Sequence, residues 1–208
     1  MTVQAVTIDA YGTLVTLRDP VPSLREALAA RGVERRLEDV ERAFRAEVAY
    51  YVPRSHEGRD DATLARLRRD CARVFLEAAG ADLAPEEFAP AFVQALVFEA
   101  VAGATAACWA LAEAGLRLAV VSNWDVGLHE QLAQLGLTAI VDAVVTSAEA
   151  GAPKPDPAIF RLALQRVGVA ADRAVHVGDA PADEEGARAA GLRYEPAPLA
   201  DAVRRILA

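Results

Sequence analysis

The sequence has few of the features that would tie a protein to a nucleic acid, a membrane or a disulfide framework. It carries 22 basic and 30 acidic residues, for a net charge of −8, and no block of Lys or Arg, which argues against nucleic-acid or anionic-membrane binding. Its most apolar stretch, residues 101–121, is interrupted by Glu113 and Arg117, too early for a membrane span. The two cysteines, Cys71 and Cys108, have no CxxC partner, so we expect two reduced, largely buried thiols.

The first residues lack the usual signals for export. The segment MTVQAVTIDAYGTL has neither the basic start nor the small-residue cleavage site of a signal peptide, so we expect a soluble, cytoplasmic protein. The 208 residues suffice for one domain, or one domain with a modest insertion, around a sizeable core.

Lysine is also scarce, because the 22 basic residues are 21 arginines and the single Lys154. An ammonium group is compact and a guanidinium group is planar, so a lone lysine in an arginine-rich chain is a candidate for a crowded anionic site. A surface lysine without a function is the competing interpretation, and the surroundings of Lys154 must decide between them.

The order of predicted elements indicates two kinds of structure. Residues 3–8 predict a strand. Residues 21–98 are helical in composition, with breaks near 32–33, 53–61, 80–85 and Pro90, which predicts about four helices. From Gly103 on, helices alternate with strands. The predicted helices cover 104–114, 126–135, 156–167, 183–190 and 199–207, and the predicted strands cover 117–121, 141–146 and 174–177, with a short segment near Leu192.

Such alternation predicts an α/β fold, a doubly wound parallel-sheet (Rossmann-like) core. We expect residues 1–17 and 100–208 to form this core domain. Residues 18–99 would form a helical-bundle cap inserted after the first strand.

Polar residues gather where the predicted strands end. They are Asp9, Tyr11 and Thr13 after the first strand, Ser122, Asn123 and Asp125 after the second, Ser147 and Lys154 after the third, and Asp179 and Asp183 after the fourth. Ligands of such sheets bind beyond the carboxyl ends of the strands, so this convergence favours a functional Lys154. Asp9 and Asp179 would repel each other without a cation between them, and oxygen ligands of this kind suit Mg²⁺.

Four segments, IDAYGTL, VVSNWD, GAPKPDPAIF and VHVGDAPADEEGARAAG, resemble in order the four motifs of the haloacid dehalogenase-like (HAD) hydrolase superfamily. The inserted helices resemble its helical cap, so the resemblance covers essentially the whole chain. It implies that Asp9 is the nucleophile, and that Thr13 supports the loop of Asp9. It further implies that Ser122 and Asn123 bind the transferred group, and that Lys154 neutralises the nucleophile and the substrate.

The same resemblance implies a bound Mg²⁺ ion. Its ligands would be Asp9, the backbone carbonyl of Tyr11, Asp179, and Asp183 directly or through a water molecule.

Tyr11 and Asp179 favour different reactions within the superfamily. Family phosphatases usually carry a second aspartate two residues after the nucleophile, as general acid and base, and losing such a group costs roughly 10²–10⁴-fold in rate. Here that position is Tyr11, as in the family's 2-haloacid dehalogenases. Those dehalogenases need no metal, and they carry a tyrosine six residues beyond the lysine. This chain has the extra carboxylate of Asp179 and, at that tyrosine position, Phe160.

We give the metal-binding signature more weight, since it changes the charge of the whole site. We therefore expect a hydrolase, a Mg²⁺-dependent phosphatase of a small, anionic phosphorylated metabolite that uses an aspartyl nucleophile. A 2-haloacid dehalogenase and a catalytically weak binding protein of the same fold are the alternatives. The sequence indicates neither the particular substrate nor an oligomeric state.

Three other polar residues have plainer interpretations. We expect Asp125 to cap the following helix, Ser147 to hydrogen-bond within its loop, and His176 to be a core histidine within an apolar strand.

Overall fold

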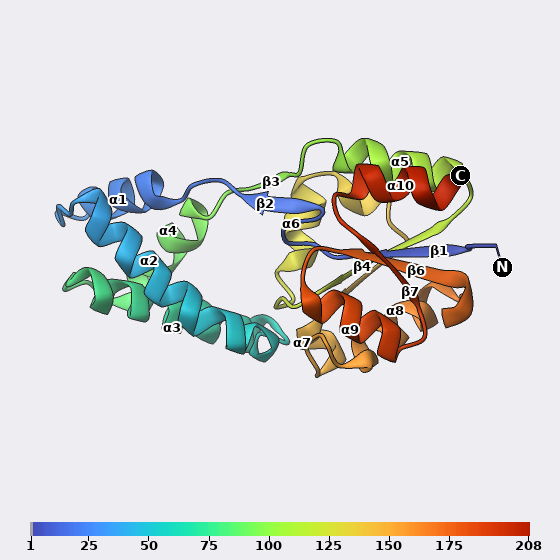
Figure 1. Cartoon of the computed structure of the whole chain (residues 1–208). Helices are drawn as coiled ribbons and strands as arrows, with labels where there is room; N and C mark the ends of the chain where they lie inside the picture. The colour runs from blue at the N-terminus through green and yellow to red at the C-terminus, as the bar shows by residue number, and fades with distance from the viewer. Residues whose placement is uncertain (1) are drawn as a thin grey trace. The chain divides into compact units, whose positions relative to one another are not determined.

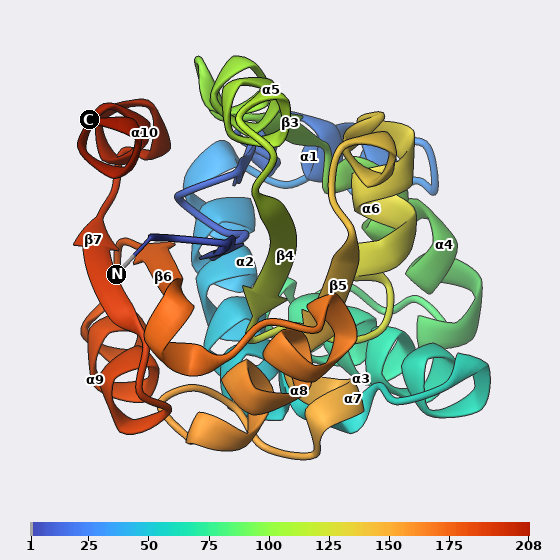
Figure 2. The same ribbon diagram turned by 90° about the vertical axis from the view of Figure 1, so that its right-hand side faces the viewer.

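The structure, a computed structural model, describes residues 2–208. Its main sheet is parallel and has the strand order β5-β4-β1-β6-β7. The strands are β1 (Ala5–Ile8), β4 (Arg117–Ser122), β5 (Ala143–Thr146), β6 (Ala174–Gly178) and β7 (Arg193–Pro196). Figure 2 shows β7 at one edge of the sheet and β5 at the other. This arrangement confirms the predicted α/β fold class.

Helices cover both faces of this sheet, as in a doubly wound fold. In Figure 1, α5 and α10 lie together on one face, and α8 and α9 lie on the other. The helices of this part of the chain are α5 (Ala104–Glu113), α6 (Leu128–Gln134), α7 (Ser147–Ala150), α8 (Pro157–Val167), α9 (Pro181–Ala189) and α10 (Leu199–Leu207), with short 3₁₀ turns η2 (Leu137–Ala139) and η3 (Ala171–Arg173). Coverage on both faces explains why β1, β4 and β6 are almost continuously apolar.

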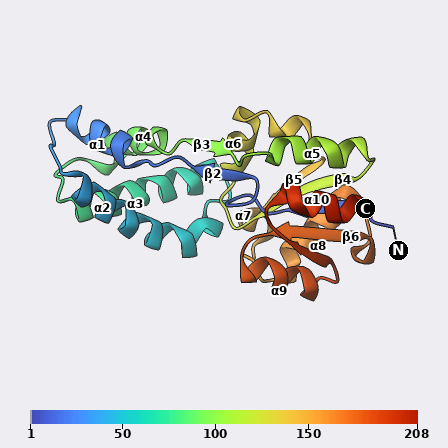
Figure 3. The same cartoon turned by 45° about the horizontal axis from the view of Figure 1, so that its top comes forward.

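The helical segment folds around its own apolar core. It contains α1 (Val21–Ala29), α2 (Leu37–Tyr51), the 3₁₀ turn η1 (Val52–Glu57), α3 (Asp61–Ala79) and α4 (Pro85–Ala95). Figure 3 shows α2 beside α3, and these helices pack against each other. At the centre, the ring of Phe75 lies 5.8 Å from that of Phe88 and 5.2 Å from that of Phe92. The four predicted helices are therefore present.

The predicted break at Pro90 is wrong, because α4 continues through this residue. A proline inside a helix costs about 3 kcal/mol. Phe88 and Phe92 flank Pro90 in α4 and are both buried, and burying one such side chain contributes about 1.5–3 kcal/mol. Together they offset the lost hydrogen bond.

Sequence reasoning also missed a small second sheet. It consists of β2 (Val15–Leu17) and β3 (Phe98–Ala100). Three residues are too few to show the alternation that predicts a strand. The described chain divides into two compact units near these strands, one holding the residues up to Thr16 with Glu99–Ala208, the other Leu17–Phe98. We call them the α/β unit and the helical unit.

Several local predictions are confirmed. Cys71 and Cys108 are free and buried, and α8 ends at Gly168, whose φ of 69° is the left-handed conformation that favours glycine. Two predictions near α6 are wrong: the helix expected at 126–135 begins later, at Leu128, and its N-cap is Gly127 in place of Asp125. Asp125 Oδ1 instead accepts a hydrogen bond from the Gly127 N–H in a turn before the helix. Among residues 2–208, none of the helices has the length and apolarity that crossing a membrane requires.

Candidate active site

The candidate site lies at the carboxyl end of the central strands. Asp9 directly follows β1, and its N–H donates to the carbonyl of Val177 in β6 at 2.9 Å. Ser122 ends the neighbouring strand β4, and its Oγ lies 3.5 Å from Asp9 Oδ1. Both side chains are buried. The parallel pairing of β1 with β4 and β6 therefore brings together residues that are more than 100 positions apart in the sequence.

Lys154 joins two carboxylates in this site. Its Nζ lies 2.5 Å from Asp9 Oδ1 and 2.5 Å from Asp183 Oδ1, and it donates to the Val121 carbonyl at 3.1 Å. These contacts use all three donors of the ammonium group. Only 8% of the residue is exposed, so the surface-lysine interpretation is wrong and the only lysine of the chain is a buried counter-ion.

Burial and charge set the ionisation of this cluster. Burial works to lower the pKa of Lys154, but the carboxylates of Asp9 and Asp183 outweigh it and raise that pKa. Burial raises the pKa of Asp9 to about 6, against the opposing effect of Lys154. Burial also acts to raise the pKa of Asp183, yet its bond to His176 and the charge of Lys154 hold that pKa well below its usual range. Lys154 thus stays charged and Asp183 ionised.

Asn123 holds the backbone of Lys154 from both sides. Its Oδ1 accepts from the Lys154 N–H at 2.7 Å, and its Nδ2 donates to the Lys154 carbonyl at 3.1 Å. Both ends of the amide are therefore occupied. These contacts position the backbone of Lys154, and the substrate contact that the sequence suggested for Asn123 stays a prediction.

Asp183 is fixed by more partners than the sequence indicated. Its Oδ1 bonds His176 Nε2 at 3.0 Å as well as Lys154, and its Oδ2 accepts from the Ala180 N–H at 3.0 Å. His176 Nδ1 in turn lies 2.9 Å from Thr7 Oγ1. His176 is fully buried, which confirms its interpretation as a core histidine. Asp183 is thus held by His176 and the Ala180 N–H while it binds the ammonium group of Lys154.

Three carboxylates in the site could hold a metal ion. One ligand atom each from Asp9, Asp179 and Asp183 lies within 4.8 Å of the others. The exposed Asp179 side chain lies against Gly12, where a Cβ atom would collide with the carboxylate, and Gly12 has a φ of +86°. Burial and the neighbouring Asp183 raise the pKa of Asp179. All-oxygen ligands with an excess of negative charge fit Mg²⁺.

Thr13 and Tyr11, the other two candidate residues of the first motif, differ in their exposure to solvent. Thr13 is buried, and its Oγ1 has no hydrogen-bond partner among residues 2–208, so its predicted support of the Asp9 loop stays a prediction. The Tyr11 side chain is 54% exposed. Its ring centre lies 6.4 Å from that of Trp124, at an interplanar angle of 58°.

Sequence reasoning missed the group of polar contacts that Glu149 forms in α7, shortly before Lys154 in the chain. Glu149 in α7 binds His129 Nε2 at 3.1 Å, Arg166 Nη2 at 3.0 Å and the Thr146 N–H at 3.0 Å. Burial favours a higher pKa for Glu149, but these partners outweigh it and lower the pKa to about 2. The Thr-x-x-Glu spacing of Thr146 and Glu149 was the available signal, since it marks a capping box.

Ser147 forms a hydrogen bond, but not within its own loop as predicted: it begins α7, and its Oγ donates to the carbonyl of Trp124, which follows β4, at 3.2 Å.

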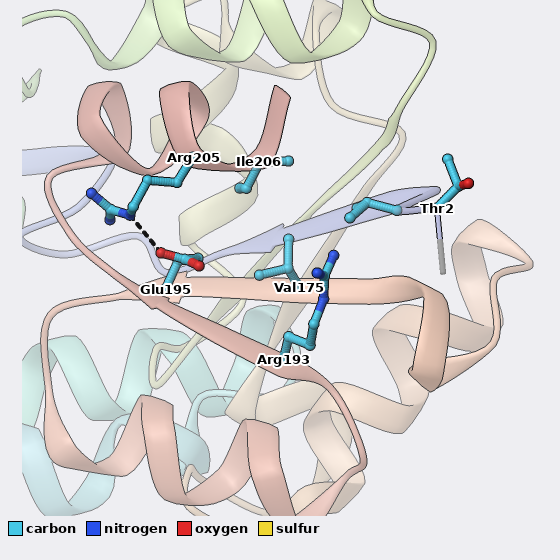
Figure 4. Close-up of a pocket in the computed structure, with 7 residues that line it drawn as sticks. Thr2, Val175, Arg193, Glu195, Arg205 and Ile206 are labelled. Carbon is cyan, nitrogen blue, oxygen red and sulfur yellow. Dashed lines mark hydrogen bonds and ion pairs between the residues drawn. The ribbon is translucent and has the colours of Figure 1, made fainter. Parts of the chain in front are cut away.

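A separate pocket of the α/β unit lies elsewhere, shown in Figure 4. Its lining includes Val175 and Arg193 near the starts of β6 and β7, whereas the carboxylate cluster lies at the ends of the strands. Arg205 Nε and Glu195 Oε2 form an ion pair there at 2.6 Å. The pocket therefore contains none of the residues of the candidate site.

Comparison with known proteins identifies the class to which this site belongs. The model of the haloacid dehalogenase-like hydrolase family matches residues 3–191. Phosphoglycolate phosphatase from Rhodospirillum rubrum is 36% identical over 204 residues, which cover 91% of this chain and 77% of that protein. The chain belongs to the haloacid dehalogenase-like hydrolase family, which confirms the resemblance seen in the four motifs.

Other similarities are shorter or more distant. Haloacid dehalogenase-like hydrolase domain-containing protein 3 from Mus musculus is 52% identical over 79 residues, covering 38% of this chain and 32% of that protein's length. The crystal structure of 2-haloacid dehalogenase from Pseudomonas syringae pv. Tomato DC3000 superposes with a TM-score of 0.69 at 24% identity, covering 99% of this chain and 98% of the other. That similarity shows the fold alone.

Proposed function

We propose that this hydrolase is a Mg²⁺-dependent phosphatase of a small, anionic phosphorylated metabolite, with Asp9 as the nucleophile. The observation that carries the proposal is the placement of Lys154 Nζ 2.5 Å from Asp9 Oδ1, inside a cluster of three carboxylates that suits a cation. The name of the Rhodospirillum rubrum relative, a phosphoglycolate phosphatase, supports a phosphatase.

The chain's own residues supply the nucleophile and the charge balance for such a reaction. The carboxylate of Asp9 attacks phosphorus, an aspartyl O–P bond forms, and the bond to the leaving oxygen breaks. Water then hydrolyses the aspartyl phosphate, which releases inorganic phosphate and restores Asp9. Lys154 balances the charge of Asp9 and of the transferred group, and the Ser122 hydroxyl donates a hydrogen bond to a phosphoryl oxygen.

Asp9, the carbonyl of Tyr11 and Asp179 would hold the Mg²⁺ ion, with Asp183 contributing directly or through a water molecule. The bound ion supplies positive charge that relieves repulsion between Asp9 and the phosphoryl oxygens. Both oxygens of Asp183 already have protein partners, which favours the route through water.

Hydrolysis of p-nitrophenyl phosphate tests this proposal. We expect turnover with Mg²⁺, loss with EDTA, and loss of at least about a thousandfold in Asp9→Asn and about a hundredfold in Asp179→Asn. Asp172→Asn is the matched control, because Asp172 is an exposed carboxylate of the same unit outside the site. Turnover unaffected by EDTA and by Asp179→Asn would contradict the role of the metal.

A second candidate reaction, dehalogenation of 2-haloacids, is favoured by Tyr11. A halide leaves without a proton, so no acid is needed two residues after Asp9. Phe160 opposes this reaction, because its ring is fully buried against His176 at 4.9 Å and offers no hydroxyl. Chloride release from 2-chloropropionate that persists in EDTA and is lost in Asp9→Asn would favour the dehalogenase over the phosphatase.

A further inference from the structure

Two aromatic side chains border the reacting groups of the α/β unit. Tyr11 lies two residues after Asp9, and Trp124 lies two residues after Ser122. Their ring centres lie 6.4 Å apart with the ring planes tilted by 58°, and the Trp124 carbonyl accepts bonds from Ser147 Oγ and the Ala148 N–H. Trp124 is 9% exposed, whereas Tyr11 is 54% exposed. The Tyr11 ring thus lies beside a buried ring and keeps a large exposed surface of its own.

The α/β unit offers no strong proton donor for a departing oxygen. The groups that act electrostatically on Asp9 are Lys154, Asp183 and Asp179. Lys154 and Asp183 hold each other, and Asp179 is assigned to the metal. His176 is fully buried, with both ring nitrogens bonded. Among the described residues of this unit, the phenol of Tyr11 is a weak acid, and none of the other titratable groups around Asp9 is free to donate a proton.

These two observations restrict the leaving group in complementary ways. Without a strong acid from this unit, the leaving oxygen departs most readily as a stable anion. A phenol ionises at about pH 10, far more readily than an aliphatic alcohol, so a phenolate departs more easily than an alkoxide. An exposed ring beside the reacting group in turn favours a flat, aromatic neighbour, since ring pairs attract each other beyond simple burial.

We propose that the substrates of this site are aryl phosphates, monoesters whose leaving group is a phenol-like hydroxyl on an aromatic ring that packs on Tyr11. This inference rests on the proposed phosphatase function. Asp9 forms the O–P bond, the P–O(aryl) bond breaks, and the phenolate takes the electron pair and leaves unprotonated. Water hydrolyses the aspartyl phosphate, and its proton goes to solvent or to the departed phenolate.

Four substrates separate the two requirements. Phenyl phosphate has a ring and a phenolate leaving group, and benzyl phosphate has a ring but an alkoxide leaving group. Acetyl phosphate has a good leaving group without a ring, and cyclohexyl phosphate has neither feature. With Mg²⁺ present, we expect kcat/KM to be highest for phenyl phosphate. It should exceed the value for benzyl phosphate by at least about a hundredfold, and cyclohexyl phosphate should rank last.

Variants of Tyr11 then separate the ring from the missing acid. Tyr11→Ala should lower kcat/KM for phenyl and benzyl phosphate about tenfold more than for acetyl phosphate, mainly through KM. Tyr11→Phe should preserve the ratio between ring and ringless substrates. Tyr11→Asp should raise the ratio of benzyl to phenyl phosphate turnover about a hundredfold, because it introduces an acid. Trp109→Ala removes an equally exposed ring on α5 and should change none of these values.

The outcomes distinguish this inference from the function on which it rests. Equal turnover of cyclohexyl and phenyl phosphate, or an equal effect of Tyr11→Ala on all four substrates, would overturn the aryl phosphate assignment while the phosphatase stands. Absence of any Asp9-dependent turnover of the four substrates, in protein shown to be folded by circular dichroism, would overturn the phosphatase function and this inference together.

Discussion

The α/β unit and the helical unit bury polar side chains to very different extents. In the α/β unit, Asp9, Ser122, Lys154, His176 and Asp183 are all buried and joined by hydrogen bonds. Within the described part of the helical unit, the buried polar side chains are Glu47 and Ser55, and three phenylalanines form its centre. One unit therefore depends on a balance of buried charges, and the other depends mainly on apolar packing.

This contrast predicts how each unit responds to a substitution. Removing one charge from a linked set leaves its partners uncompensated, which affects every member at once. Removing an apolar side chain leaves a local cavity. The expected effect of a substitution therefore falls in size from Lys154 through Phe88 and Glu47 to Asn123.

Lys154→Met should have the largest effect, since it leaves two buried carboxylates without their cation. We expect a loss of about 3–5 kcal/mol in the free energy of unfolding without Mg²⁺, together with loss of turnover. Urea denaturation at pH 7 measures the first effect and p-nitrophenyl phosphate hydrolysis the second. Arg161→Met, which removes an exposed cation on α8, should cost less than about 0.5 kcal/mol. A similar cost for both variants would contradict the buried-charge description.

Phe88→Ala should destabilise the helical unit by about 3–5 kcal/mol, because the Phe88 ring is fully buried and stacks on Phe75. Thermal unfolding followed by circular dichroism measures this loss. The control is Val52→Ala, at a side chain of the same unit that is 62% exposed. A loss below about 1 kcal/mol in Phe88→Ala would mean that the three rings do not form the centre of this unit.

Glu47→Gln tests the one buried acid of the helical unit. Burial raises the pKa of Glu47 from 4.5 to about 7, against a hydrogen bond with Cys71. Between these values the folded protein keeps a proton that the unfolded chain has released, so stability falls as the pH rises and levels off above pH 7. The shift corresponds to about 3 kcal/mol. Glu47→Gln removes this contribution.

The stability of Glu47→Gln relative to wild type should therefore increase by about 3 kcal/mol between pH 4.5 and pH 8, as measured by urea denaturation. The exposed Glu57 provides the control substitution, Glu57→Gln. A constant difference between Glu47→Gln and wild type across this range would show that Glu47 is ionised in the folded protein.

Asn123→Ala should have the smallest effect of the four. It removes two hydrogen bonds to the Lys154 backbone, which should cost about 1–3 kcal/mol in stability. Loosening of Lys154 should lower kcat about tenfold with little change in KM. A change in KM alone would instead support the substrate contact that the sequence suggested.

The order of the elements was predictable from the sequence because most of them are long and periodic. The strands β1, β4 and β6 are apolar runs, and the predicted range of α10, 199–207, matches the structure. The short strands β2 and β3 gave no pattern, and the continuation of α4 through Pro90 depends on Phe88 and Phe92 packing against Phe75 of the preceding helix α3. Tertiary packing of this kind cannot be read from local composition.

The site was predictable to a similar extent. Asp9, Ser122 and Lys154 could be located because parallel strands end at one edge of the sheet. The bond from Asn123 to the Lys154 backbone could not, because it joins residues 31 positions apart. Asn123 is the only asparagine of the chain, so the scarcity that drew attention to Lys154 applied equally to its partner.

This pairing of two unique residues makes the site unusually accessible to spectroscopy. Selective ¹⁵N labelling of lysine would place a single labelled side chain in the protein, and its ammonium nitrogen lies 2.5 Å from both Asp9 and Asp183. Labelling of asparagine would likewise mark one side-chain amide, the group that binds the Lys154 carbonyl. Two resonances, each assigned without further mutagenesis, would then report proton position, ion binding and turnover at the reacting carboxylate directly.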